Sequence, residues 1–293
     1  MPLPDPMSGV VEASPAELAS RCGGIDPARI VVGLALRDGG GGLAFGREAF
    51  DSEVFGLEVG RVLSLWALAT EQHEILLRAL TSRAARLGYD QVLRRVPCED
   101  LAQTWALQRA GYALLDVGVT FTRRLHGPFG PSLRPDMKVR VATAKDMEEI
   151  VAAMLDVPWG GRLDADPTYP PARVRDLRAR WLRNSQQGRA DHVLVAEIDG
   201  AVAGYATCIL DAHTGTGDIE LVGTLPPFRR RGVGRTVVDH AVAWFSSRTD
   251  VVTVRTQATN YAAAALYETA GFTLHASDLT LRLALTHSEE EVR

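Results

Sequence analysis

The chain has 293 residues, more than one compact core usually contains, so two domains are the first expectation. Its composition, 46% hydrophobic and 23% charged, is that of a globular protein and excludes a disordered or fibrous chain. The net charge of −4 and the lack of any stretch near the ~18 apolar residues of a membrane span give no reason to expect nucleic acid or a membrane as partner.

The cysteines and the first residues indicate a compartment. Cys22, Cys98 and Cys208 have neither CxxC nor metal-ligand spacing, which fits a reducing cytoplasm better than a disulfide framework. Residues 1–7 lack the basic and then apolar pattern of a secretory signal. We therefore expect a cytoplasmic protein without a metal site.

The first half of the chain predicts alternating helices and strands. In residues 108–114 (QRAGYAL), Gly111 ends a helix and the aromatic Tyr112 opens a strand. A helix over 75–85 and a strand over 91–96 precede this point, and a strand over 118–125 follows it.

The second half begins after a predicted linker. Residues 126–136 (HGPFGPSLRPD) are rich in proline and glycine, as linkers are. Segments 193–198 and 201–210 flank Asp199-Gly200, a dipeptide that favours a two-residue hairpin turn between antiparallel strands. The later predicted elements are a strand over 219–224, a helix over 235–245, a strand over 251–256 and a strand over 278–285.

The two halves repeat each other. Residues 268–274 (ETAGFTL) match 108–114 at an offset of 160 (271 − 111). Three further predicted elements of the second half fall on elements of the first half at the same offset. We expect an α+β protein of two tandem, related units, 1–125 and 137–293, each a mixed and mostly antiparallel sheet flanked by helices.

The sharpest motif lies between a predicted strand and helix, at residues 224–235 (TLPPFRRRGVGR). Its glycines allow a tight turn and bring backbone N–H groups close to a ligand, while the helix N-terminus favours an anion. A dinucleotide loop would need a third glycine where Val237 stands, and a phosphate loop of the Walker type would need a lysine. The candidates to bind a pyrophosphate are Arg229, Arg230, Arg231, Gly232, Val233, Gly234, Arg235 and Thr236.

The R-x-x-G-x-G arrangement resembles the pyrophosphate loop of the GNAT acetyltransferase superfamily. Residues 260–272 (NYAAAALYETAGF) are similar to the superfamily pattern N-x-x-A-x-x-L-Y-x-x-x-G-F. The resemblance covers about residues 138–285 and implies an N-acyltransferase that uses acetyl-CoA or another acyl-CoA. It further implies that Tyr267 protonates the departing thiolate, that Asn260 contacts CoA, and that pantetheine and the thioester lie along Val222, Gly223 and Thr224.

The first unit is expected to be degenerate. The offset places Tyr267 on Leu107, which has no proton to donate. It also places 229–234 on 69–74 (ATEQHE), which has no glycine and is net acidic. We expect this unit to keep the frame without binding CoA.

Other segments resemble the TDP-fucosamine acetyltransferases, which also pair a partial first unit with a complete second one. Residues 51–61 (DSEVFGLEVGR) look like their D-S-x-F-F-G opening, and 161–167 with 181–185 resemble their acceptor-side segment. The resemblance implies a primary amine on a nucleotide-linked amino sugar, whereas departures at Gly161 and Leu163 leave a small polar amine as the acceptor. The acceptor-pocket candidates are Trp159, Arg162, Tyr169 and Trp181.

The attacking amine must lose a proton, and the sequence leaves the base open. Asp218 and Glu220 lie two apart on the strand before the loop, so they are expected to share one face. Either carboxylate or a water chain is a candidate. The alternative functions are acetylation of a protein N-terminus or lysine, and binding of acyl-CoA by a non-catalytic pseudoenzyme. Nothing in the sequence indicates an oligomeric state.

Overall fold

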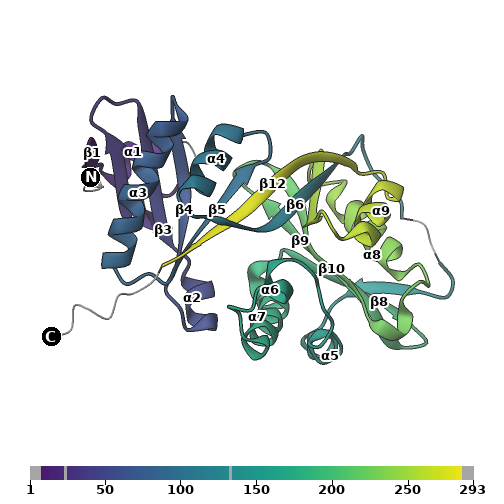
Figure 1. The fold of residues 1–293 in the computed structure, drawn as a ribbon. Coiled ribbons are helices and arrows are strands. Elements are labelled where there is room, and N and C mark those ends of the chain that lie inside the picture. The colour runs from purple at the N-terminus through teal and green to yellow at the C-terminus, as the bar shows by residue number, and fades with distance from the viewer. Residues whose placement is uncertain (1–7, 23–24, 132–133, 286–293) are drawn as a thin grey trace. The chain divides into compact units, whose positions relative to one another are not determined.

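The computed structural model describes residues 8–22, 25–131 and 134–285 (Figure 1). The chain divides into two compact units, Met1–Asp116 with Asp278–Arg293, and Val117–Ser277. Residues 1–7 and part of the predicted linker, 132–133, lie outside the described residues. The described remainder of that linker contains no helix or strand.

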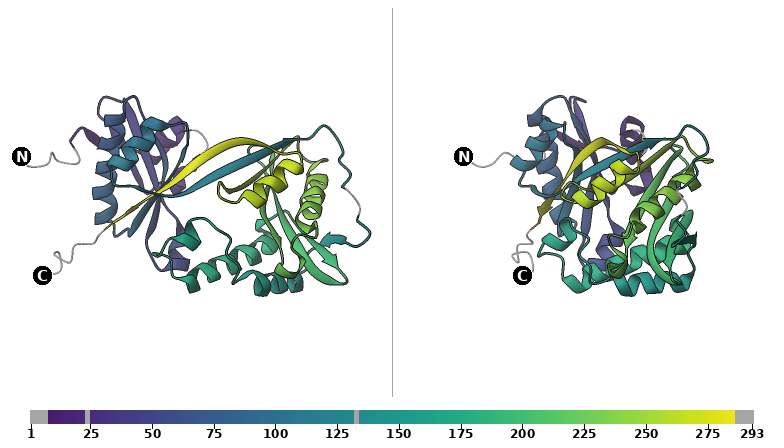
Figure 2. Two further views of the ribbon diagram at one scale, coloured as in Figure 1. Left: turned by 45° about the vertical axis from the view of Figure 1, so that its right-hand side comes forward. Right: turned by 90° about the vertical axis from the view of Figure 1, so that its right-hand side faces the viewer.

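The first unit is a mixed sheet with helices on both faces (Figure 2). Helices α3 and α4 pack on one face of the sheet through Leu76 and Leu107. On the other face, Leu18 of α1 packs against Ala44. Neighbouring strands are antiparallel except for the parallel pair β4–β5. In sheet order its strands are β1 (Val10–Glu12), β2 (Val32–Leu36), β3 (Gly41–Arg47), β4 (Val59–Ala67), β5 (Gln91–Pro97) and the second half of β12 (Thr273–Ala284); its helices are α1 (Pro15–Cys22), the short η1 (Pro27–Arg29), α2 (Ala49–Phe55), α3 (Thr70–Arg86) and α4 (Leu101–Arg109).

The second unit has the same strand order and again a single parallel pair, β10–β11, among its described pairings. Helices α5 and α7 pack on one face of its sheet and α8 on the other (Figure 1). In sheet order its strands are β7 (Lys138–Val141), β8 (His192–Ile198), β9 (Ala201–Asp211), β10 (Thr216–Thr224), β11 (Val251–Gln257) and the second half of β6 (Ala113–Arg124); its helices are α5 (Ala144–Met154), α6 (Arg162–Ala165), α7 (Pro171–Asn184), η2 (Ser185–Arg189), η3 (Pro226–Phe228), α8 (Val233–Phe245) and α9 (Tyr261–Thr269).

The internal repeat is confirmed. Strand β11, helix α9 and strand β12 begin and end 160 residues after β5, α4 and β6. The local signals repeat as well, because Asp100 and Asn260 each cap their helix by accepting a bond from the N–H three residues later. Gly111 and Gly271, with φ of 89° and 81°, turn the chain after each helix in a conformation that suits glycine.

The last strand of each repeat pairs outside the unit that its place in the chain suggests. Residues 118–124 of β6 pair with β11, and residues 278–284 of β12 pair with β5. The compact units therefore break near residues 116 and 277 instead of near the linker. Strand sequences carry the alternation that forms a strand but not the identity of its partner, so the expected ranges 1–125 and 137–293 did not include this exchange.

The hairpin predicted around Asp199-Gly200 is confirmed. Strands β8 and β9 pair antiparallel across it, and both turn residues have positive φ, 52° and 78°. This is the geometry of a two-residue turn whose twist matches the flanking strands.

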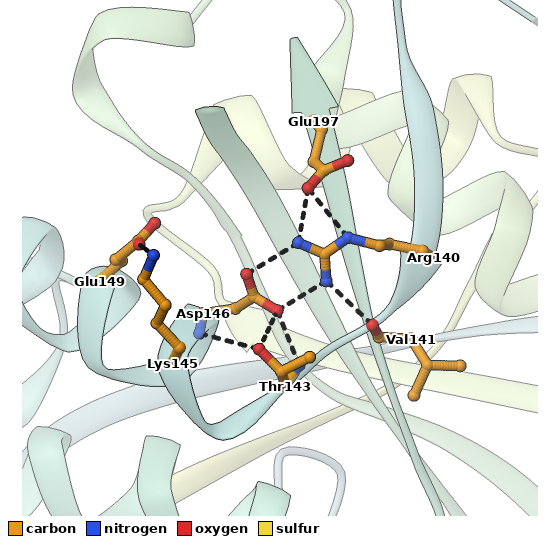
Figure 3. Close-up of polar contacts among 7 residues, drawn as sticks. All are labelled: Arg140, Val141, Thr143, Lys145, Asp146, Glu149 and Glu197. Atoms are coloured by element: carbon orange, nitrogen blue, oxygen red, sulfur yellow. Dashed lines mark hydrogen bonds and ion pairs between the residues drawn. The ribbon is translucent and has the colours of Figure 1, made fainter. Parts of the chain in front are cut away.

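A partly buried ionic cluster holds the start of α5 (Figure 3). The Arg140 guanidinium donates to both carboxylate oxygens of Asp146, at 2.6 and 2.8 Å, and to Glu197 at 2.9 Å. Asp146 also accepts bonds from the backbone N–H and hydroxyl of Thr143, the N-cap of α5. These contacts, the bond from Arg140 first, lower the pKa of Asp146. The cluster joins β7, β8 and α5, and Met154 at the end of α5 lines the cavity described next.

Candidate active site

A cavity opens where β10 and β11 part. Residues 217–219 of β10 pair with 252–254 of β11, and the described strands share no pair beyond Ile219. The register of β10 against β9 also shifts between Ile219 and Leu221, as at a β-bulge. The opening beyond this point is a cavity of about 690 Å³, which β10, β11, α9, the loop before α8 and residues 154–160 line.

Alternate backbone N–H groups of β10 point into this opening. The N–H of Leu225 donates to the Ala203 carbonyl and that of Leu221 to the Thr207 hydroxyl, so the odd-numbered residues here face β9. The N–H groups of Val222 and Thr224 therefore face the side from which β11 has diverged. They are donors for a ligand that lies along β10, and they are placed to stabilise an oxyanion.

The arginine–glycine loop delivers the N-terminus of α8 to the cavity. Gly232, the N-cap of α8, has a φ of 82°, and Gly234 lies so close to α9 that a Cβ there would be 3.2 Å from Leu266. Arg229 and Gly234 line the cavity. The first N–H groups of a helix have no partner within the helix, so this end of α8 suits an anion.

Other candidates in this loop have different surroundings. Arg230 and Arg231 are exposed and do not line the cavity. Val233 and Thr236 are buried on the inner face of α8, which leaves their backbone as the part that a ligand could contact. The Arg235 guanidinium pairs with Asp239 at 2.7 Å and donates to the Thr269 carbonyl at 2.6 Å, so it ties α8 to the end of α9.

Tyr267, the candidate acid, lies on α9 and lines the cavity. Tyr267 is 5% exposed, and its ring packs against those of Phe121 and Phe272, with centroids 5.8 and 6.2 Å away. Burial, assisted by the charge of Asp218, raises the pKa of Tyr267 to about 12. Asn260 also lines the cavity while it caps α9 and donates to the Thr256 hydroxyl at 3.0 Å.

The two candidate bases are placed differently. Glu220 lines the cavity and forms an ion pair with Arg189. Asp218 does not line it; its carboxylate accepts a bond from the Thr253 hydroxyl at 2.9 Å, and burial raises its pKa. The bulge after Ile219 interrupts the alternation on which the prediction of a shared face depended.

Three of the four acceptor-side candidates line a cavity, and these three divide between two cavities. Trp159 and Trp181, with ring centroids 6.3 Å apart, line the main cavity. Tyr169 lines a second cavity of about 590 Å³, and Arg162 donates to the Tyr169 hydroxyl at 3.2 Å. The structure therefore brings the tryptophans, and not the Arg162–Tyr169 pair, to the opening in the sheet.

Sequence reasoning missed several site residues. Tyr205 of β9 and Arg255 of β11 line the main cavity, and each belongs to a strand whose neighbours must be known before its side chain can be placed. Arg134, from the predicted linker, donates to the Arg231 carbonyl at 3.2 Å and so braces the loop. A positively charged residue in a linker gives no signal of this contact.

The first unit has no comparable loop between β4 and α3, both of which the structure describes in full. Only residues 68–69 separate β4 from α3, whereas residues 225–232 separate β10 from α8. Leu107, the counterpart of Tyr267, is fully buried. This connection has no room for a loop like that of the second unit.

One cavity thus combines two parallel strands that diverge, backbone N–H groups that point into the opening, and a helix N-terminus. This is the arrangement of an acyl-CoA-dependent N-acyltransferase. Residues 152–272 match the model of the Acetyltransferase (GNAT) family. The chain thus contains a GNAT-family N-acetyltransferase domain, whose reaction is acyl transfer from acetyl-CoA.

The relatives agree with this family. The chain is 26% identical over 249 residues to "Spore coat polysaccharide biosynthesis protein SpsD" of Bacillus subtilis, and the aligned region covers 81% of each protein. It is 28% identical over 139 residues to an "Uncharacterized N-acetyltransferase" of Archaeoglobus fulgidus, and that aligned region covers 45% of this chain and 89% of the relative.

Solved structures show the same fold. A GCN5-related N-acetyltransferase from Sphaerobacter thermophilus has a TM-score of 0.62 at 16% identity and covers 92% of this chain and 85% of its own. A tandem GNAT protein from the clavulanic acid biosynthesis pathway has a TM-score of 0.59 at 12% identity and covers 96% and 99%. The tandem frame inferred from the internal repeat therefore has a structural counterpart.

The described residues contain neither a metal-binding group of side chains nor a helix that could span a membrane. Across residues 8–22, 25–131 and 134–285, no three His, Cys, Asp or Glu side chains group as a metal site would need. In the same ranges no helix has the length and apolar content that crossing a bilayer requires.

Proposed function

We propose that the second unit transfers an acetyl group from acetyl-CoA to the primary amine of a small molecule by direct attack, with Tyr267 as the general acid. The observation that carries the proposal is that one cavity collects Tyr267, Arg229 and the inward N–H groups of β10, together with Glu220 and the two tryptophans. Donor and acceptor can then meet without a covalent enzyme intermediate.

The residues present fit a CoA-type donor. Arg229 and the first turn of α8 offer positive charge and N–H groups to the pyrophosphate. Val222 and Thr224 offer N–H groups along the opened strand, where an extended amide-containing arm can continue the sheet pattern. Asn260 and Leu266 of the α9 segment line the same space.

The chemistry follows from protonation states. The amine lone pair forms the C–N bond as the C–S bond breaks, and the proton of the amine leaves to Glu220 or through water to solvent. Tyr267, with its raised pKa, is protonated at neutral pH and has a proton to give. Because a thiol, with a pKa of about 8.5, is the stronger acid, a hydrogen bond from Tyr267 to the developing charge on sulfur supplies much of the effect.

An amino sugar is the acceptor class to test first. The name of the Bacillus subtilis relative places it in polysaccharide biosynthesis. On this chain, the acceptor-side wall combines two aromatic rings, Trp159 and Trp181, with the carboxylate of Glu220. Aromatic faces and a few polar groups suit a sugar ring bearing an amine.

The test is release of CoA thiol from acetyl-CoA against a panel of amines: nucleotide-linked amino sugars, free amino sugars, short peptides and polyamines. We expect turnover with an amino sugar, and a product heavier by one acetyl group in mass spectrometry. Turnover with peptides alone would contradict the small-molecule acceptor, and no turnover with any amine despite acetyl-CoA binding would contradict the enzymatic proposal.

A further inference from the structure

A second tyrosine, Tyr205, lines the main cavity. Tyr205 of β9 is paired with Gly223 of β10, and its ring covers that glycine. A Cβ on Gly223 would be 2.6 Å from Cζ and 2.7 Å from the hydroxyl oxygen of Tyr205. The absence of a side chain at Gly223 thus lets the phenol lie against β10, between the two residues whose N–H groups face the opening.

Tyr205 and Tyr267 reach the cavity from opposite faces of the sheet. Tyr205 packs among residues of α5 and α7, such as Met147 and Leu182. Tyr267 packs in the other core, with Val237 of α8 and Phe272. Both tyrosines nevertheless line the same cavity, because β10 and β11 have separated there.

The companions of Tyr205 mark its side as the acceptor side. Trp159 packs against the same core, and Trp181 and Glu220 line the cavity with Tyr205. Tyr205 is 2% exposed, and burial raises its pKa. It is therefore a neutral phenol that can accept an N–H hydrogen bond but cannot serve as a base at neutral pH.

We propose that the Tyr205 hydroxyl orients the attacking amine: its oxygen accepts one N–H bond, which turns the nitrogen lone pair toward the thioester carbonyl. This inference rests on the proposed function. The amine forms the C–N bond, the C–S bond breaks, and Tyr205 keeps its own proton throughout. The proton lost by the amine goes to Glu220 or to water, so Tyr205 acts by geometry and not by titration.

The test is Tyr205→Phe in the full chain, which keeps the ring and removes only the hydroxyl. We expect kcat with the best amine to fall about 10- to 100-fold, the effect of one transition-state hydrogen bond. The Kd for acetyl-CoA and the melting temperature stay at wild-type values. The rise of kcat/KM with pH keeps its midpoint, since Tyr205 does not titrate.

Tyr112→Phe is the matched control. Tyr112 is 3% exposed, does not line the cavity, and its hydroxyl has no hydrogen-bond partner among the described residues. This variant loses a buried phenol hydroxyl and should keep full kcat. Wild-type kcat in Tyr205→Phe would overturn the inference, as would a loss of acetyl-CoA binding or stability that accounts for the fall. If the proposed function is wrong, the wild-type chain itself will acetylate no amine of the panel. The proposed function is therefore tested separately from the role of Tyr205.

Discussion

Four arginines of the loop before α8 have the same charge but different environments. Arg229, Arg230 and Arg231 are all exposed, but only Arg229 of these three lines the cavity. Arg235 is held by Asp239 and Thr269. Because the four arginines are close in sequence, all of them were predicted to lie near a pyrophosphate. The lining of the cavity singles out Arg229.

Arg229→Gln should therefore weaken CoA binding about 10- to 100-fold, the usual worth of a charge-assisted hydrogen bond to phosphate. Arg230→Gln is the matched control, because it removes the same charge one residue away and should change the Kd less than 3-fold, by roughly the exposed-charge effect. Calorimetric titration with CoA measures both. Equal losses in the two variants would show that the loop acts by net charge alone.

Single residues also show what sequence could predict. Tyr267, Gly234 and Asn260 were found because their spacing follows the chain, and the structure places all three on the cavity. Tyr205 was missed because its place depends on pairing with Gly223, 18 positions away on another strand. The structure has a bulge between Ile219 and Leu221, beside the candidate bases Asp218 and Glu220, and a bulge leaves no clear mark in the residues around it.

At the scale of elements, the start of α5 depends on the Arg140 cluster. Asp146 is buried and receives hydrogen bonds from Arg140 and Thr143, so its carboxylate is the centre of the cluster. Asp146→Asn should lower the free energy of unfolding by about 2 kcal/mol at pH 7, because it leaves Arg140 with half of its charge partners. Urea unfolding measures the change.

The pH dependence of this loss has a definite sign. The pKa of Asp146 is below its ordinary value, so its contribution is present above about pH 4 and is lost as the pH falls toward the lowered pKa. The gap between wild type and Asp146→Asn should therefore narrow below about pH 4. A gap that is constant from pH 7 to pH 3 would mean that the carboxylate charge is not what stabilises α5.

Most elements were predictable where local signals were strong. The glycine stops at 111 and 271 and the Asp199-Gly200 turn are properties of short segments, and the structure has them where expected. Strand β10 begins at Thr216, earlier than predicted, because its first residues pair with β9. Helix α8 begins at Val233, directly after its N-cap Gly232 and also earlier than predicted.

At the scale of the molecule, the exchange of strands decides which residues stabilise which unit. Leu281 belongs to the last strand of the chain but is fully buried in the core of the first unit. Val254 of β11 is buried in the core of the second unit. The linear order of the chain would assign both residues to the second unit.

Leu281→Ala should remove about 3 kcal/mol of stability from the first unit, as a core leucine does, while Val254→Ala removes about 2 kcal/mol from the second. Hydrogen exchange read by mass spectrometry should show faster exchange in β3 and β5 for Leu281→Ala, and in α8 and β10 for Val254→Ala. Faster exchange in α8 with an unchanged β5 for Leu281→Ala would contradict the exchange of strands.

The measurement that tests the central claim most directly is the rate of acetyl transfer by Tyr267→Phe, across pH 6 to 10, with the best amine from the panel. We expect kcat to fall by about 100-fold or more with an unchanged Kd for acetyl-CoA, because the ring remains and the proton donor is lost. For the wild type, kcat/KM should rise with pH as the amine deprotonates and then level off without falling, since the Tyr267 pKa of about 12 keeps the phenol protonated. Wild-type kcat in Tyr267→Phe, or a fall in wild-type rate below pH 10 that this variant abolishes, would contradict the assignment.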